Sequence, residues 1–254
     1  MYTIKPFSIN RVMVEDANKL GQKIPFVYVL AEIDITGVKK KIKDYNQLNN
    51  SQLTLNNFFL YCFSKTVSDK RDLHAIKNWK NQLIVFDDID VFFPIEKNIN
   101  DQKVIQPLII KAINKKSIFQ INTEIESFRI STSSNINKSQ YYFLKLPYFI
   151  KKYFYSIWMK IPKMRKGIFG TAYYSAGGMF GTSKGWGFPI PIHSVGMFLG
   201  SFSKVEKIEK GEIKNVEILT FTVIMDHSIN DGAELGRFVH NFKKNIDLHL
   251  KIFN

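Results

Sequence analysis

The chain has 254 residues, which suffices for one large domain or two small ones with a sizeable buried core. Hydrophobic residues make up 45% of it and charged residues 23%, which is ordinary for a soluble globular protein. The single cysteine excludes an intramolecular disulfide, and no apolar run approaches the roughly 18–20 residues of a membrane span. The N-terminus also lacks the pattern of a signal peptide, so we expect a cytoplasmic protein.

The charge of the chain is strongly positive, because 36 basic residues against 22 acidic ones give a formal net charge of +14. This balance favours an anionic partner, such as nucleic acid, a membrane surface or a phosphorylated cofactor. The lysines are scattered rather than clustered, and we find no zinc-binding spacing, no phosphate-binding glycine loop and no basic recognition helix. We therefore expect neither a metal site nor nucleic-acid binding.

The first predicted elements in chain order are a short helix at 12–19 and a strand at 24–36 that is rich in β-branched and aromatic residues. Thr36 is placed to cap a helix that begins at residue 37. Thr54 is placed to cap a longer helix. The apolar residues of that helix form a broad stripe that we expect to be buried: Leu55, Phe58, Phe59, Cys62 and Phe63.

The middle of the chain predicts a strand pair at 81–96 around an acidic turn and a further strand at 103–113 that Pro107 interrupts. A predicted helix and a polar loop lead to a segment at 140–163, in which aromatic residues are interleaved with lysines. This segment is either an amphipathic helix that touches lipid or covers an apolar acceptor, or a helix broken near Pro147 that packs on the main sheet or at a subunit contact. We favour the packing helix, because aromatic stripes are usually buried.

Two segments near the C-terminus contain candidate catalytic residues. The first, GTAYYSAGGMFG at 170–181, predicts a strand and a glycine-rich turn, and it contains Ser175. The second begins with the alternating strand LTFTVI at 219–224 and ends in an amphipathic helix. Between this strand and helix lies DHSINDG, with His227 and Asp231 four residues apart. Such junctions present side chains to a cleft, and a histidine there can act as a base near neutral pH.

The HxxxDG pattern at this junction resembles the active-site motif of the chloramphenicol acetyltransferase superfamily, and more closely that of the catalytic acyltransferase cores of 2-oxo acid dehydrogenase complexes. IPFVYVLAEIDIT and VIQPLII resemble two further segments of those cores, one before the first helix and one that lines the cofactor channel. GTAYYSAGGMFG resembles the family's GTFTISNLGMFG, and the 52 residues from Ser175 to His227 agree with the family's spacing. The resemblance runs from Ile24 to the C-terminus, apart from the segment at 140–163.

The resemblance implies an α+β fold, a two-layer sandwich like that of chloramphenicol acetyltransferase, in which helices cover a mixed β-sheet. It implies a single acyltransferase catalytic domain at 1–254, with an insert at about 135–165. The family forms homotrimers with the active site between subunits, so His227 of one chain would face Ser175 of its neighbour. The resemblance leaves open whether such trimers assemble into a larger cage. We expect acyl-coenzyme A as the acyl donor and no covalently attached lipoyl group in this chain.

The resemblance also assigns chemical roles. His227 would act as the general base and Ser175 would stabilise the oxyanion, while a thiol, hydroxyl or amine acceptor attacks acyl-coenzyme A directly in a ternary complex. Asp231 would fix the local architecture through an ion pair with an arginine, for which Arg11 is the one early candidate. Gly232 would allow a close approach of backbone.

Three positions leave alternatives open. Ser228 stands where the dehydrogenase cores usually have arginine, which puts in doubt the contact that this arginine makes. His193 is either a substrate-binding residue that faces the acceptor or a hydrogen-bonded structural histidine, which we favour. Asp226 replaces the second histidine of chloramphenicol acetyltransferases, so chloramphenicol is an unsupported acceptor. The alternative to an enzyme is a non-catalytic trimeric or cage-forming structural subunit.

Overall fold

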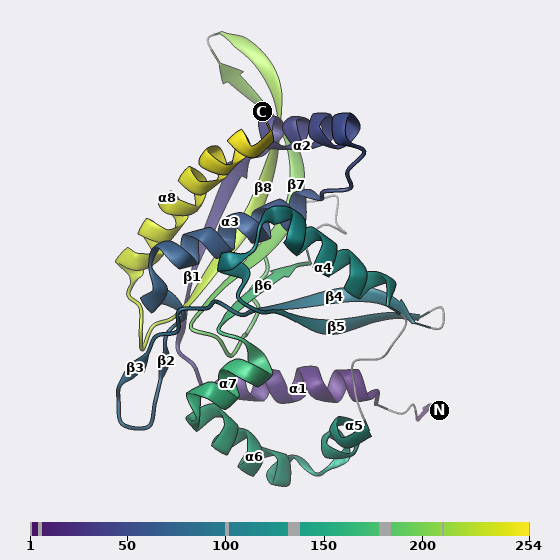
Figure 1. Cartoon of the computed structure of the whole chain (residues 1–254), viewed down its shortest axis with the longest axis vertical. Helices are drawn as coiled ribbons and strands as arrows, with labels where there is room; N and C mark the ends of the chain where they lie inside the picture. Colours follow the sequence, from purple (N-terminus) through teal and green to yellow (C-terminus); the bar gives the residue numbers. More distant parts are fainter. Residues whose placement is uncertain are drawn as a thin grey trace.

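Six strands form one mixed β-sheet in the order β1-β8-β7-β6-β4-β5 (Figure 1). The computed structural model describes residues 2–4, 7–99, 102–131, 138–177, 184–209 and 211–253. β6 runs parallel to both of its neighbours, and the other pairs are antiparallel. A separate hairpin of β2 and β3 projects from the main sheet. The strands are β1 (Phe26–Asp34), β2 (Ile76–Lys77), β3 (Leu83–Ile84), β4 (Val91–Ile99), β5 (Gln102–Ile110), β6 (Ala172–Ala176), β7 (Val195–Glu209) and β8 (Glu212–Asp226).

Four helices cover one face of this sheet in Figure 1: α2 (Thr36–Asn49), α3 (Leu55–Asp69), α4 (Ile118–Ile130) and α8 (Gly232–His249). The other four gather below the sheet in that view: α1 (Ile9–Gly21), α5 (Lys138–Lys145), α6 (Tyr148–Lys160) and α7 (Pro162–Phe169). Short 3-10 turns follow three of the longer elements: η1 (Arg71–His74), η2 (Ile113–Lys115) and η4 (Leu250–Phe253). In the described part of the chain, no helix has the length and apolar character needed to cross a membrane.

The main core lies between the sheet and the covering helices, with α3 at its centre. Phe59 and Phe63 of α3 are fully buried. Phe63 packs on Tyr174 of β6 and Phe59 packs on Phe242 of α8, with ring centroids 5.7 Å and 6.3 Å apart. Cys62 is buried beside them, and burial raises the pKa of its thiol, as a structural cysteine requires. The predicted two-layer α+β architecture is confirmed.

The predictions about helix caps had different outcomes. Thr54 caps α3 as predicted, because its hydroxyl accepts from the Asn57 N–H at 3.1 Å. The prediction that Thr36 caps α2 is wrong. The Thr36 N–H donates to Asp34 Oδ1 at 2.9 Å, and its hydroxyl accepts from the Glu217 N–H at 2.9 Å. The aspartate therefore caps the turn, and the threonine ties α2 to β8 instead.

The prediction that Pro107 interrupts a strand is also wrong, because β5 continues through it from Gln102 to Ile110. Pro107 stands opposite Pro94 of β4, so neither residue could supply an N–H to the other. β5 is the edge strand of the sheet, and β4 pairs with β6 only at Val91 and Phe92. The two proline rings therefore lie at a position in the pairing of β4 and β5 where no backbone N–H donor is needed.

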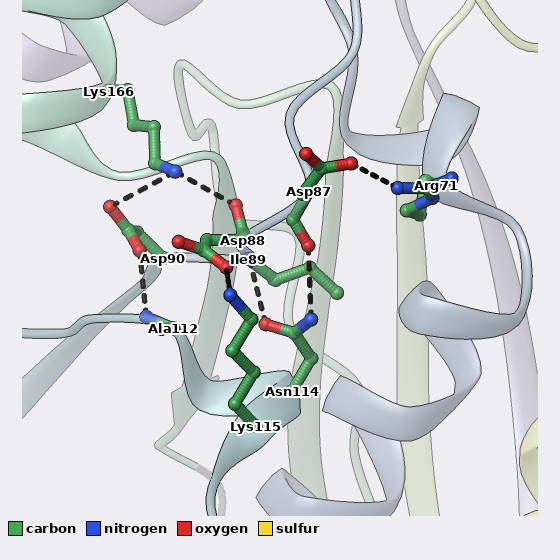
Figure 2. Close-up of polar contacts among 9 residues, drawn as sticks. All are labelled: Arg71, Asp87, Asp88, Ile89, Asp90, Ala112, Asn114, Lys115 and Lys166. Carbon is green, nitrogen blue, oxygen red and sulfur yellow. Dashed lines mark hydrogen bonds and ion pairs between the residues drawn. The ribbon is translucent and has the colours of Figure 1, made fainter.

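The acidic turn before β4 binds groups from several other segments (Figure 2). The Lys166 ammonium of α7 donates to the Asp88 carbonyl at 3.0 Å and lies 3.8 Å from the Asp90 carboxylate. Each carboxylate of the turn also binds a group from another segment. Asp87 pairs with Arg71 of η1, Asp88 pairs with Lys115 of η2, and Asp90 accepts from the Ala112 N–H. These contacts fasten η1, η2 and α7 to the start of β4.

The same turn fixes the start of β6, the strand that contains Ser175. The Asp90 carbonyl accepts from the N–H groups of Thr171 (2.7 Å) and Ala172 (3.1 Å), and the Thr171 hydroxyl accepts from the Asp90 N–H at 3.1 Å. Gly170 has a φ of +81°, and a Cβ there would stand 2.6 Å from the Asp90 carbonyl oxygen. Only glycine fits this position, so the entry into β6 is rigidly defined.

The insert forms two helices, α5 and α6, which are separated at Pro147 as predicted. α6 packs against α7, against Phe143 of α5, and against α1. The Lys151 ammonium donates to the Asp16 carboxylate of α1 at 2.6 Å, and the Tyr155 hydroxyl donates to the same oxygen at 3.0 Å. Lys151 and Asp16 are each only 3% exposed. A buried ion pair with an added hydrogen bond therefore anchors the insert.

Two histidines are buried within the chain, His74 at the end of η1 and His193 just before β7. Burial lowers the pKa of each imidazole to about 4. The Nε2 of His193 lies 2.7 Å from the Phe169 carbonyl, which can only accept, so this nitrogen carries the proton of the neutral ring. Both rings are therefore neutral in the folded protein near neutral pH.

We predict that Asp16→Asn destabilises the protein while Glu15→Gln, one residue away on α1, does not. The first change leaves the Lys151 ammonium buried without a compensating charge, which should cost about 3–5 kcal/mol in the free energy of unfolding. Glu15 pairs with Lys19 at the exposed surface, where an ion pair contributes little. Urea unfolding of both variants measures the difference, and equal midpoints would contradict the role of the buried pair.

We also predict that the protein loses stability as the pH falls from about 6.5 to 4. The unfolded chain protonates its histidines near pH 6.5, whereas His74 and His193 stay neutral in the folded state down to about pH 4. Each of these histidines lowers the free energy of unfolding by at most about 1.4 kcal/mol for every unit that the pH falls within this window. Urea unfolding at several pH values should show this slope, and His193→Gln should remove one histidine's share. A wild-type stability that is flat over the window contradicts the assignment.

Candidate active site

His227 lies directly after β8, in the turn that leads to α8. Its N–H donates to the Pro25 carbonyl, just before β1, at 2.8 Å. The preceding Asp226 N–H donates to the Ser194 carbonyl, just before β7, at 2.9 Å. The Asp226 carbonyl in turn accepts from the Asn230 N–H at 2.9 Å, which closes the turn. The backbone of His227 is thus held by the ends of three strands.

One hydrogen bond within the turn orients the imidazole of His227. Its Nδ1 lies 3.0 Å from the carbonyl oxygen of Asn230. Because a carbonyl can only accept, Nδ1 carries the proton and Nε2 keeps its lone pair. Asn230 is itself buried, and its side-chain amide lies 3.5 Å from the Leu73 carbonyl in η1. The exposed ring of His227 therefore presents a proton-accepting Nε2 at the surface of the chain.

Asp231 has a structural role in the turn. Its carboxylate accepts from the Glu234 N–H at 3.0 Å and so caps α8. No ion pair of Asp231 occurs among the described residues, and Arg11 lies in α1, so the predicted pairing with Arg11 is wrong for a single chain. Within the described part of the chain nothing approaches the position of a Cβ on Gly232, so the close backbone approach expected there is also absent.

Ser175 lies in β6 on the face of the sheet opposite the main core. Along this strand Ala172 and Tyr174 are buried in the core, so Tyr173 and Ser175 point the other way. Ser175 is half-buried. Burial raises the pKa of the Tyr173 phenol, and an interaction with the Ser175 hydroxyl offsets part of that rise. The hydroxyl groups of these two residues thus form a small polar pair on the outer face.

The strand register separates Ser175 from His227 within one chain. Ser175 stands opposite Phe198 of β7, and Phe198 stands opposite Thr222 of β8. His227 follows Thr222 by five residues along the chain. With about 3.3 Å per residue and about 4.8 Å between strands, the two α carbons are roughly 19 Å apart. The structure therefore does not bring these two predicted catalytic residues together in a single subunit.

His193 is buried against two aromatic rings. Its ring packs on those of Phe92 and Tyr173, with centroid separations of 5.7 Å and 6.0 Å, and the residue is 4% exposed. Together with the hydrogen bond to Phe169, this environment favours the structural alternative for His193. The ring contacts Tyr173, the residue that lies on the same face of β6 as Ser175.

Sequence reasoning did not identify two residues that shape these positions. Asn230 orients His227, and Tyr173 adjoins Ser175. A signal was present for Tyr173, which precedes Ser175 by two residues, so that both lie on one face of a strand; for Asn230 the sequence shows only its position inside DHSINDG. The signal for Asn230 is weaker, because a backbone carbonyl is the acceptor and any residue would provide one.

No cluster suitable for a metal ion occurs in the described ranges. VIQPLII, which was expected to line a cofactor channel, forms most of the edge strand β5, where Ile105 is exposed. A shallow pocket between α2 and the start of α3 is lined by Lys39, Ile42 and Leu55 among others. α2 follows the end of β1 that pairs with Ile218, eight residues before Asp226 along β8, so this pocket is remote from His227.

Comparison with protein families identifies one match, to the catalytic domain of 2-oxoacid dehydrogenases acyltransferase, over residues 3–140 and 166–253. The family model leaves out residues 141–165, which contain most of the predicted insert. Among curated proteins, none matches this sequence.

Solved structures that share the fold include the following three. A probable dihydrolipoamide acetyltransferase from Listeria monocytogenes 4b F2365 superposes with a TM-score of 0.69 at 18% identity, covering 97% of this chain and 94% of the other. The dihydrolipoamide acetyltransferase of Azotobacter vinelandii has a TM-score of 0.69 at 15% identity, with coverage of 96% and 91%. Chloramphenicol acetyltransferase has a TM-score of 0.52 at 13% identity, with coverage of 95% and 99%.

The Azotobacter structure was studied for the roles of a serine, a histidine and an asparagine in its catalytic mechanism. The sequence intervals between those three residues equal the intervals from Ser175 to His227 and from His227 to Asp231. An asparagine thus occupies the place in that enzyme where this chain has Asp231. Since the family model matches nearly all of the sequence outside the insert, the chain belongs to the family of 2-oxoacid dehydrogenase acyltransferase catalytic domains.

Proposed function

We propose that this acyltransferase moves an acyl group from acyl-coenzyme A to a thiol, hydroxyl or amine acceptor, by direct attack in a ternary complex. The observation that supports this most strongly is the fixed imidazole of His227, whose Nδ1 is bound to the Asn230 carbonyl while Nε2 is left free to accept a proton. A family membership alone would indicate an acyltransferase; the oriented ring adds the base that the reaction needs.

His227 acts as the general base in this proposal. An acceptor must lose a proton as it attacks the thioester carbon, and a positioned imidazole provides roughly 10²–10⁴-fold of rate for that step. The Asn230 carbonyl keeps the tautomer correct and also stabilises the imidazolium that forms when Nε2 takes the proton. The proton then passes to the departing thiolate of coenzyme A.

Ser175 stabilises the oxyanion in this proposal. The carbonyl oxygen becomes negative in the tetrahedral intermediate, and one well-placed donor is worth about 2.7–4 kcal/mol. Two observations support Ser175 as that donor: its sequence interval to His227 is repeated in the Azotobacter enzyme, and its strand is fixed by the Asp90 carbonyl. Tyr173 adjoins Ser175 on the same face of the strand.

We further propose that the site forms between subunits. A base and an oxyanion donor that act on one thioester must each come within about 3 Å of the reacting atoms. The roughly 19 Å between Ser175 and His227 in one chain is too far for that. The edge of one subunit that presents His227 would therefore face the outer sheet surface of the next. Such head-to-tail contacts close into rings, which is consistent with a homotrimer and leaves a larger cage open.

Asp231 acts in this proposal by holding the turn, and its negative charge is not required. The asparagine at this place in the Azotobacter enzyme supports this, since asparagine and aspartate cap helices about equally well. Ser228 stands where an arginine usually follows the histidine, and the proposal assigns no role to that arginine's contact. The proton transfer in this proposal therefore depends on His227 and on the Asn230 carbonyl that orients its ring.

A release assay for free coenzyme A, with a panel of acyl-coenzyme A donors and of thiol, hydroxyl and amine acceptors, tests the proposed function. We predict that His227→Ala abolishes turnover while the thermal unfolding and oligomeric state stay as in the wild type. The matched control is His240→Ala, which removes an exposed histidine on α8 and should keep full activity.

Two results would contradict the proposal. Equal turnover in His227→Ala and wild type would remove the base assignment. A wild-type protein that assembles but releases no coenzyme A with any donor would favour the non-catalytic structural subunit.

A further inference from the structure

The outward face of α6 is unusual because it is apolar and cationic, whereas the inward face holds the polar anchor. Lys151 and Tyr155 point inward and bind Asp16 of α1. The inward face also holds Trp158 and Met159, which pack with Tyr155 in a small hydrophobic cluster. Other large apolar side chains point outward, with Phe149 exposed to 74% and Tyr153 to 67%. A helix that served only to pack on the protein would present these two aromatic residues inward as well.

The exposed side chains of α6 follow helical spacing. Phe149, Tyr153 and Ile157 recur at every fourth position and are all exposed. Lys152 and Lys160 lie beside this row, and neither has an ion-pair partner among the described residues. The outward face therefore combines a row of aromatic and aliphatic groups with lysines whose long side chains can reach a negatively charged layer.

All the charged residues in the stretch of sequence that contains α6 are basic. From residue 127 to residue 205 the chain contains no aspartate or glutamate, and eight lysines and arginines fall between residues 138 and 166. The acidic side chains of neighbouring α1, Glu15 and Asp16, are already paired with Lys19 and Lys151. The surface that α6 presents therefore complements an anionic partner rather than the same surface of a second copy, which would place like charges together.

The family comparison separates this surface from the common core. The family model matches the chain on both sides of residues 141–165 but not within them, and α6 lies wholly inside that gap. Contacts that family members share would have to be made by the matched residues. In Figure 1, α6 also lies at the lower end of the molecule, with α1 between it and the sheet.

From these observations we propose that α6 docks on an anionic lipid surface and lies flat in the headgroup layer. Phe149, Tyr153 and Ile157 would insert at the boundary with the acyl chains, while Lys152 and Lys160 contact lipid phosphates. The helix rests on the surface and does not span it, in keeping with its thirteen residues. Docking would place the chain at a membrane independently of the acyl-transfer chemistry.

Sedimentation with lipid vesicles tests the proposal on the full-length chain. Wild-type protein should bind vesicles of phosphatidylcholine with about 30% phosphatidylglycerol, bind phosphatidylcholine alone at least about tenfold less, and dissociate in about 0.5 M NaCl. The triple variant Phe149→Ser/Tyr153→Ser/Ile157→Ser should bind at least about tenfold less than wild type, because it removes the inserted apolar groups. Lys152→Gln/Lys160→Gln should lose most of the preference for anionic vesicles.

Matched control variants on other surfaces separate docking by α6 from nonspecific hydrophobic or electrostatic binding to vesicles. Ile208→Ser/Ile213→Ser removes two exposed isoleucines from the β7–β8 hairpin, and Lys243→Gln/Lys244→Gln removes two exposed lysines from α8. Both controls should bind vesicles as the wild type does, and thermal unfolding checks that each variant is folded.

Three outcomes would overturn the proposal. Wild-type protein could fail to bind anionic vesicles, or the α6 variants could bind as tightly as the controls. In the third, the triple variant would change the sedimentation coefficient of the assembly in the absence of lipid, which would make the face a contact between copies of the chain.

Discussion

The register of β6, β7 and β8 is the constraint on which the proposed chemistry depends. Ser175 lies near the end of its strand on the outer face, and His227 lies beyond the end of a strand two places away. Because strands in a sheet are rigid, no side-chain rotation closes the roughly 19 Å between them. In the proposed mechanism a single chain thus holds two half-sites. The ring of His227 is exposed, and no described residue lies near the position of a Cβ on Gly232. This surface therefore has room for a neighbouring subunit.

Each half-site is supported in a different way. His227 depends on its own turn, where the Asn230 carbonyl sets the tautomer and the Asp231 carboxylate caps the next helix. Ser175 depends on distant segments, since the Asp90 carbonyl fixes the start of its strand, and that turn is itself tied to η1, η2 and α7 (Figure 2). Changes near Asp90 would therefore reach Ser175 through the backbone, while His227 would be unaffected.

Much of the fold could be predicted from the sequence because local signals agreed with tertiary structure. The period of apolar residues located α3, β8 and α8, and the HxxxDG spacing placed His227 at a strand–helix junction. The failures have physical causes. Thr36 and Pro107 were judged as isolated residues, but Asp34 competes for the cap, and Pro107 stands opposite Pro94 on an edge strand. Both outcomes depend on neighbours that only the folded chain reveals.

The candidate site was only partly predictable for a related reason. Residue types and spacing suggested His227 and Ser175, but the orientation of a ring by the Asn230 carbonyl leaves no trace in side-chain chemistry. The packing of α6 was likewise only partly predictable, because Tyr155, Trp158 and Met159 pack inward beside the ion pair of Lys151 and Asp16. Phe149 and Tyr153 of the same helix lie at the surface.

Subunit complementation tests the central claim most directly. His227→Ala and Ser175→Ala chains are co-expressed so that they mix within one assembly, and release of coenzyme A is measured against each variant alone. If sites form between subunits, random mixing pairs an intact His227 with an intact Ser175 at about one quarter of the contacts, so activity returns to about a quarter of the wild-type rate. If mixed assemblies are no more active than the better parent, the two residues do not act across a subunit contact.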